Sequence, residues 1–277
     1  MTIHFQTTGS GEPVIIFVHG FGCALSDWDA QVAHLSSRFR CIALDLPGHG
    51  SSPLPQAQAM SALTDAVNQV KAQAGTAPVI LVGHSLGTRL ITDAYLQAPD
   101  RVIGLVFVDG RYYKGAPDAM VQRMAALVDG PDGFRGFMQR SFTGMFTDRG
   151  DPDLRGRVTQ RAMTMNPQFG RAILLESVLW DASRGLQKIR DIAVPVLLLQ
   201  SSDIDSDRRL ISMRPGMRTR YMDVVAESVA DADVKIVAGV GHFASLEAPG
   251  VVSHEIEAFV DRVSTGTQPE PPARGPA

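Results

Sequence analysis

The stretch VILVGHSLGTRL, Val79 to Leu90, places the polar turn GHSLG between two apolar runs. The first run has the pattern of a buried strand and the second that of a helix, so the turn joins them without an ordinary loop. Ser85 stands at the tip of this turn. Gly83 and Gly87 flank it and remove the Cβ atoms that would collide where strand and helix approach. This pattern is typical of a nucleophile elbow, in which unpaired N–H groups at the helix start face the serine.

Further short apolar runs surround this turn along the chain. Most are continuous Val, Ile, Leu and Phe rather than alternating, which is typical of parallel strands covered on both faces. Segments with helical patterns separate them, so we expect an α/β fold with right-handed crossovers. The predicted strands are 14–20, 39–45, 78–84, 102–110, 194–200 and 233–239.

The alternation of strands and helices breaks between Arg111 and Asp191. This segment has loose helical patterns interrupted by Gly and Pro, and it holds six of the eleven methionines. We therefore predict a helical cap at 111–191, inserted into a core made of 1–110 and 192–263. The last segment, 264–277, is rich in Pro and Gly, and we expect a disordered tail there.

Composition excludes several classes of protein. A net charge of −3 argues against a nucleic-acid partner. No apolar run is long enough to span a membrane, and the first residues lack the basic and apolar regions of a signal peptide, so we expect a cytoplasmic protein. Cys23 and Cys41 do not form a CxxC pair. No histidine or carboxylate cluster has metal-ligand spacing, and phosphate-binding and dinucleotide motifs are missing, so we expect no metal and no cofactor.

Three further motifs accompany GHSLG in the same order as in a known superfamily. They are HGFG (His19–Gly22), DLPGHG (Asp45–Gly50) and GVGHFASLEAP (Gly239–Pro249). With these motifs the chain resembles the α/β-hydrolase superfamily from Phe5 to Val263, and in particular its serine esterases and lactonases with a helical cap. The resemblance implies a doubly wound, mostly parallel sheet of about seven or eight strands, with the cap inserted after the family's sixth strand.

The resemblance also implies the partners of the nucleophile. His242, in the motif GHF after the last predicted strand, has the position of the general base that takes the proton of Ser85. The acid that orients this histidine departs from the family pattern. Relatives usually carry a Gly after the preceding strand with the acid a few residues on, whereas this chain reads QSSDIDSD. Asp205 is the first choice because the long following loop can reach back, and Asp203 and Asp109 remain alternatives.

Further candidate residues follow from the same motifs. The oxyanion hole needs two N–H donors, and we expect them from the backbone of Leu86, after the nucleophile, and of Phe21, after His19-Gly20. The cap methionines, among them Met145, are candidates for an adaptable apolar wall. Arg111, just past the strand 102–110, is a candidate for holding a substrate carboxylate.

A serine nucleophile with this constellation predicts acyl transfer to water. We expect a serine hydrolase that cleaves a carboxylic ester of a small or medium substrate through an acyl-serine intermediate, with a small-molecule ester or lactone as its partner. Two alternatives stay open. One is a lactonase of the acyl-homoserine-lactone type. The other is a cofactor-free enzyme on the same scaffold that performs oxygen chemistry, C–C cleavage or acyl transfer.

Overall fold

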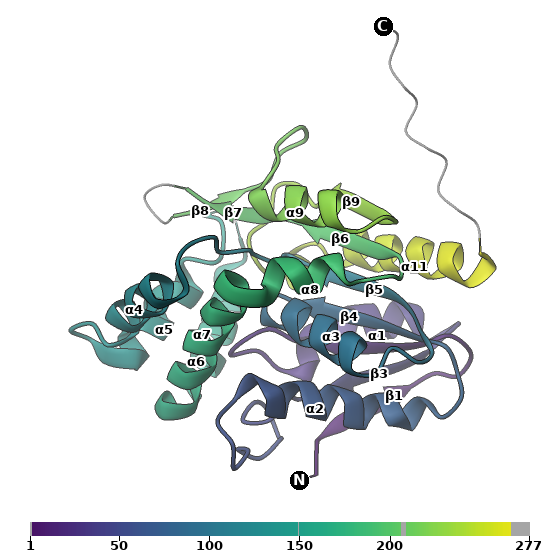
Figure 1. The fold of residues 1–277 in the computed structure, drawn as a ribbon, viewed down its shortest axis with the longest axis horizontal. Helices are drawn as coiled ribbons and strands as arrows, with labels where there is room; N and C mark the ends of the chain where they lie inside the picture. Colours follow the sequence, from purple (N-terminus) through teal and green to yellow (C-terminus); the bar gives the residue numbers. More distant parts are fainter. Residues whose placement is uncertain (1, 149, 206–208, 267–277) are drawn as a thin grey trace, which may run out of the picture.

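A seven-stranded sheet with six parallel strands forms the centre of the protein (Figure 1). The structure is a computed structural model that describes residues 2–148, 150–205 and 209–266. The strand order is β1-β3-β2-β4-β5-β6-β9, and only the edge strand β1 runs antiparallel, against β3. The strands are β1 (Phe5–Thr8), β2 (Val14–Val18), β3 (Arg40–Leu44), β4 (Val79–His84), β5 (Val102–Val108), β6 (Val196–Gln200) and β9 (Ala232–Ile236).

The sequence of the central strands explains why they lie inside. Every residue of β2 and β4 is buried, as expected for a parallel sheet covered on both faces. Successive side chains of β2 point to opposite faces, so Ile16 and Val18 join one hydrophobic cluster while Ile15 and Phe17 join another. The core therefore consists of two apolar layers, one on each side of the sheet.

Helices cover both layers (Figure 1). One face packs against α1 (Asp29–Leu35) and the long α11 (Pro249–Thr265). The other packs against α2 (Met60–Lys71), α3 (Leu86–Gln97), α8 (Leu186–Arg190) and α9 (Arg220–Ser228). Shorter elements are α10 (Ala244–Glu247) and the 3₁₀ turns η1 (Leu25–Trp28) and η2 (Ala72–Ala74). This is the doubly wound α/β arrangement that the sequence predicted.

The segment between β5 and β6 is helical and projects from one end of the sheet (Figure 1). It contains α4 (Pro117–Val128), α5 (Gly133–Thr143), α6 (Pro152–Ala162), α7 (Pro167–Trp180) and the π-helical turn η3 (Asp181–Gly185), and then leads into α8. We call residues 111–191 the cap. A third apolar cluster joins it to the core, because Phe142 and Met138 of α5 pack with Cys23 and Phe243 from two core loops.

A buried ion pair ties the cap to the helix that follows Ser85. Arg89 of α3 donates from Nε and Nη2 to the carboxylate of Asp181 in η3, at 2.9 and 2.6 Å, and both side chains are nearly inaccessible. Removing one member would leave the other charge buried and unpaired, which typically destabilises a protein by about 3–5 kcal/mol. This pair thus ties the cap to the first turn of α3.

The structure adds elements that the apolar runs did not predict. The edge strand β1 has four exposed residues, and the hairpin of β7 (Ser202–Ile204) and β8 (Leu210–Ser212) is short and polar. Counted along the described chain, the strand before the cap is the fifth, β5.

At the end of the chain, α11 continues to Thr265, past the predicted start of the tail, and residues 267–277 lie outside the described part. None of the helices described is both long and apolar enough to cross a membrane.

Candidate active site

Ser85 occupies a strained turn between β4 and α3. Its backbone angles are φ 53° and ψ −111°, a left-handed conformation that residues with a Cβ rarely adopt. A Cβ at Gly83 would lie 2.5 Å from the carbonyl oxygen of Gly87, and a Cβ at Gly87 would lie 2.5 Å from that of Val18. Strand, turn and helix can approach this closely only with glycine at both positions, as the sequence predicted.

His242 lies on the loop after β9 and is held from two sides. Its backbone N–H donates to the carbonyl of Met145 in the cap at 2.8 Å. Its own carbonyl lies 2.9 Å from Nε2 of His84, the residue before Ser85, and the two rings have centroids 4.7 Å apart. The cap and the end of β4 therefore both position the predicted base beside the elbow.

The carboxylate that contacts His242 belongs to Asp109, at the end of β5. Asp109 Oδ2 lies 2.5 Å from His242 Nδ1, and the Asp109 side chain is completely buried. Oδ1 accepts the backbone N–H groups of Ser201 and Ser202, both at 2.7 Å, and the side-chain amide of Gln200 at 3.0 Å. The Ser202 hydroxyl donates to Oδ2 at 2.5 Å. Both oxygens of the buried Asp109 carboxylate are thus hydrogen-bonded to protein groups, and the His242 ring is one of these groups.

These contacts set the protonation states of the pair. Burial lowers the pKa of His242 below its usual value, although Asp109 acts in the opposite direction, so the ring is neutral near pH 7. Burial alone would raise the pKa of Asp109, but the hydrogen bonds and charge of His242, the Arg111 charge and the Ser202 hydroxyl hold it below the usual range. A carboxylate bonded at Nδ1 leaves Nε2 of a neutral imidazole free to accept a proton.

The first choice for the acid, Asp205, is therefore corrected. Asp205 is half-buried in the turn of the β7–β8 hairpin, where its carboxylate accepts the backbone N–H of Arg209 at 2.8 Å. The alternative Asp203 accepts the N–H of Ile204 at 2.8 Å. Strands β7 and β8 pair as a hairpin, and backbone N–H groups in or next to these strands donate to both carboxylates. Asp109, the third candidate, takes the contact with the histidine.

The sequence interpretation missed the role of Gln200, Ser201 and Ser202. The sequence did offer a signal, because it lacks the glycine that the family usually carries after this strand. In its place, QSS (200–202) brings two N–H groups, a hydroxyl and an amide to the point where β6 ends beside β5. The Ser201 hydroxyl also donates to the carbonyl of Gly241 at 2.7 Å, next to the histidine. Residues 200–202 thus hold both the Asp109 carboxylate and the loop that carries His242.

The two residues expected to supply the oxyanion donors lie on the same cavity as Ser85. Phe21 and Leu86 both line the cavity that contains Ser85. In the described part of the chain, neither backbone N–H donates to another protein group. Leu86 is the first residue of α3, so its N–H is also one of the unpaired donors at the positive end of the helix dipole.

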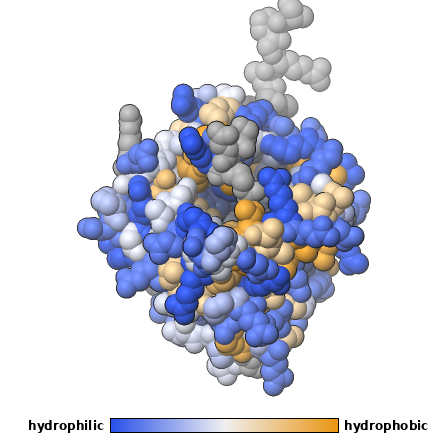
Figure 2. Space-filling view, turned by 90° about the vertical axis from the view of Figure 1, so that its left-hand side faces the viewer, coloured by the Kyte–Doolittle hydropathy of each residue, from blue (hydrophilic) through white to orange (hydrophobic). Residues whose placement is uncertain are grey.

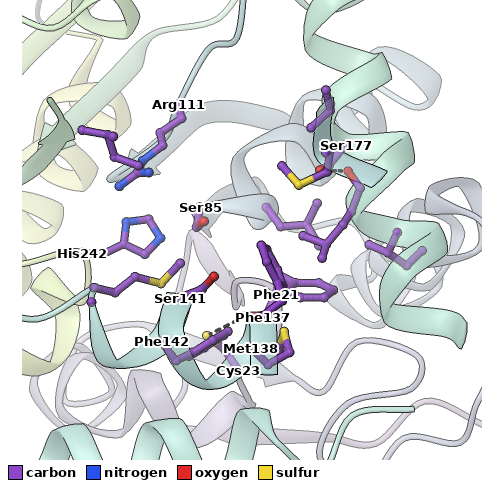
Figure 3. A pocket seen from close by; sticks show the side chains of 18 of the residues that line it. Phe21, Cys23, Ser85, Arg111, Phe137, Met138, Ser141, Phe142, Ser177 and His242 are labelled. Carbon is purple, nitrogen blue, oxygen red and sulfur yellow. Dashed lines mark hydrogen bonds between the residues drawn. The ribbon is translucent and has the colours of Figure 1, made fainter. Parts of the chain in front are cut away.

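A cavity of about 400 Å³ opens over Ser85, between the sheet and the cap. Figure 2 shows the cap end of the molecule hollowed near its centre, with hydrophobic residues at the hollow. In Figure 3, Ser85, His242 and Arg111 lie on one side of the cavity and the apolar side chains Phe21, Phe137 and Met138 on the other. Met145, the other predicted substrate contact, also lines it. The volume suits a small or medium molecule.

One group of side chains elsewhere has the composition of a metal site. Ligand atoms of His34, His254 and Glu257 lie within 4.8 Å of one another on the outer surface of α1 and α11. The Glu257 carboxylate is already bonded to His34 and to Arg38. The group contributes no residue to the lining of the cavity over Ser85.

Comparisons with known proteins place the chain in a family. A model of the alpha/beta hydrolase family matches residues 15–255. A 2-(acetamidomethylene)succinate hydrolase from Mesorhizobium japonicum is 26% identical over 94% of this chain and 92% of that protein. An (E)-2-((N-methylformamido)methylene)succinate hydrolase from Acinetobacter baylyi is 33% identical over 47% of this chain.

The first curated relatives match only locally, over 29% to 50% of their own length. Among solved structures, a thermophilic esterase from Thermogutta terrifontis superposes with a TM-score of 0.76 at 22% identity, covering 94% of this chain and 93% of that one, a likeness of fold. The family model spans most of the sequence, and the doubly wound sheet and the serine elbow agree with it. The chain therefore belongs to the alpha/beta hydrolase family.

Proposed function

We propose that the protein is a serine hydrolase that cleaves a carboxylic ester of a small or medium substrate through an acyl-serine intermediate. The observation that carries this proposal is the arrangement of Ser85, His242 and Asp109: a serine at a strained elbow and a histidine bonded to a buried carboxylate, both on one cavity. Nucleophile, base and orienting acid are the three parts that activation of a serine requires.

In the proposed mechanism, the Ser85 oxygen attacks the carbonyl carbon of the ester while Nε2 of His242 takes the hydroxyl proton. Asp109 keeps the other ring proton on Nδ1 and offsets the positive charge that forms on the ring. The N–H groups of Phe21 and Leu86 stabilise the tetrahedral oxyanion, and each such donor is typically worth about 10²–10³ in rate. The imidazolium then protonates the leaving alcohol.

The acyl-serine is released by the reverse sequence of proton transfers. Water attacks the acyl carbonyl as His242 accepts its proton, and the histidine returns that proton to Ser85 as the carboxylic acid departs. The positions of the histidine and the oxyanion donors are unchanged in this half-reaction. One set of residues therefore serves both steps.

An amide or lactone substrate is the second candidate. One relative that aligns over most of this chain is a 2-(acetamidomethylene)succinate hydrolase, whose name describes hydrolysis of a substrate other than a simple ester. The same acyl-serine chemistry would serve such bonds and the lactones predicted from the resemblance. Product masses from a panel of lactones and N-acyl enamines distinguish these substrates from esters.

The test is turnover of p-nitrophenyl acetate, butyrate and hexanoate by purified protein, with Ser85→Ala as the control. We expect a burst of p-nitrophenol followed by steady turnover, and loss of both in the Ser85→Ala protein. Absence of a burst and of turnover with every ester in the wild type contradicts the proposal. Activity retained by the Ser85→Ala protein contradicts the assignment of the nucleophile.

A further inference from the structure

Arg111 carries unused hydrogen-bonding capacity beside the catalytic residues. It follows Asp109 and Gly110 at the end of β5, and its side chain lines the cavity over Ser85. Its Nε and Nη2 atoms are buried and have no hydrogen-bond partner in the protein. Buried donors of a charged group are costly to leave unsatisfied, so these atoms are expected to serve a molecule that enters the cavity.

The other two arginines that line the cavity are already paired. Arg89 is bonded to Asp181 at 2.6 and 2.9 Å, and Arg140 is bonded to Asp132. In the described part of the chain, no aspartate or glutamate is among the residues that line the cavity. Arg111 is therefore the lining cation without a carboxylate bonded to it, and the cavity favours a negative charge at its position.

We propose that Arg111 binds a carboxylate of the substrate, so that the enzyme's substrates are esters bearing one carboxylate on a short spacer from the bond that is cleaved. This inference rests on the proposed ester hydrolysis and names its substrate class. A planar guanidinium with two free N–H groups suits a carboxylate, which accepts two parallel hydrogen bonds.

The layout of the cavity indicates how such a substrate lies. Arg111 and His242 are on one side of Ser85 in Figure 3, and Phe21, Phe137 and Met138 are on the other. With the carboxylate on Arg111 and the carbonyl carbon at Ser85, the remainder of the molecule extends along the apolar side chains. The substrate thus carries its charge near the cleaved bond and an apolar group at the opposite end.

Arg111 has a second possible role, because its charge also acts on the catalytic pair. The positive charge lowers the pKa of both Asp109 and His242. A purely structural arginine that keeps Asp109 ionised would affect all substrates equally. The test must therefore measure preference between substrates rather than activity alone.

The first experiment compares p-nitrophenyl pentanoate with the mono-p-nitrophenyl ester of glutaric acid, which has the same acyl length and a terminal carboxylate. The wild type is expected to have the higher kcat/KM for the glutaric ester. In Arg111→Gln, the ratio of the two kcat/KM values should fall about 10- to 100-fold, the effect of losing hydrogen bonds to a charged group. Arg123→Gln, at an exposed position of α4 outside the cavity lining, is the matched control, and it should leave the ratio unchanged.

A second experiment separates this inference from the proposed function. Calorimetry measures binding of glutarate to Ser85→Ala and to the Ser85→Ala/Arg111→Gln double variant, without any turnover. We expect binding to the first and at least tenfold weaker binding to the second. Ester turnover with an unchanged substrate ratio and equal glutarate binding overturns the carboxylate site and leaves the hydrolase standing. Arg111-dependent glutarate binding without ester turnover supports the site and overturns the hydrolase.

Discussion

Two neighbouring strands, β5 and β6, end side by side at the edge of the sheet near Ser85, and carboxylates follow both. Asp109, after β5, is completely buried, and its two oxygens contact three backbone or side-chain N–H groups, the Ser202 hydroxyl and the His242 ring. Asp203 and Asp205, after β6, are half-buried and bonded to the N–H groups of their own hairpin. The comparison teaches that the surrounding donors, rather than the order along the chain, decide which carboxylate can serve the histidine.

The largest expected effect comes from exchanging Asp109 for an amide, and the same exchange at Asp203 and Asp205 provides the comparison. Asp109→Asn should lower kcat by about 10⁴-fold, because an amide does not hold the histidine in the required tautomer or offset its charge. Asp205→Asn and Asp203→Asn should change kcat by about twofold or less, as is usual for substitutions outside buried networks. Initial rates with p-nitrophenyl butyrate provide the measurement. If Asp205→Asn and Asp109→Asn lowered kcat to a comparable extent, the proposed difference between the two strand ends would be contradicted.

A smaller effect tests whether the end of β6 serves the acid of β5. Ser202→Ala removes the hydroxyl that donates to Asp109 Oδ2. Hydrogen bonds to charged groups contribute about 1.5–3 kcal/mol, so kcat/KM should fall about 10- to 100-fold. Ser212→Ala is the matched control in the same hairpin, since the Ser212 hydroxyl is buried without a partner. Equal activity of the two variants would show that the Ser202 hydroxyl is dispensable.

Burial of histidines around the end of β4 predicts a dependence of stability on pH. Burial lowers the pKa of His49 to about 4 and that of His84 to about 3, and it also lowers the pKa of His19. Below pH about 6.5 these histidines bind protons in the unfolded chain but not in the folded protein. The free energy of unfolding is therefore highest above that pH and falls as the pH decreases towards the folded pKa values. Each such histidine contributes a slope of about 1.4 kcal/mol per pH unit.

Urea unfolding between pH 7.5 and 5 measures this slope. His84→Gln, if folded, should show a shallower decrease than the wild type, because one titrating group is removed. A free energy of unfolding that stays constant over this range would contradict the buried, neutral state of these rings.

The smallest expected effect concerns the pH dependence of the rate. Burial holds the pKa of His242 below 6.5, so the acidic limb of kcat/KM should lie below that pH in the wild type and in Asp205→Asn. Since Asp109 raises this pKa, the residual activity of Asp109→Asn should have its acidic limb at still lower pH. Profiles of kcat/KM from pH 4.5 to 8 provide the test. A limb that moves in Asp205→Asn would indicate that this carboxylate, too, acts on the histidine.

The contrast between the strand ends also explains what the sequence could predict. The buried strands and the Ser85 elbow were predictable because continuous apolar runs and two obligatory glycines act locally. The edge strand β1 was missed because its four residues are exposed and carry no apolar run. The acid could not be chosen, because the contact between Asp109 and His242 joins residues 133 positions apart and depends on donors from a third segment, Gln200 to Ser202. Arg111 was a candidate from its place after a strand, but its unpaired Nε and Nη2 atoms are visible only in three dimensions.

Covalent labelling with a fluorophosphonate tests the central claim most directly, because the reagent reports an activated serine without any assumption about the substrate. The account predicts one adduct by intact-protein mass, located at Ser85 by peptide mapping, no adduct in Ser85→Ala, and labelling that is far slower in Asp109→Asn than in Asp205→Asn. A folded wild-type protein that remains unlabelled, or that carries the adduct on another residue, would contradict it.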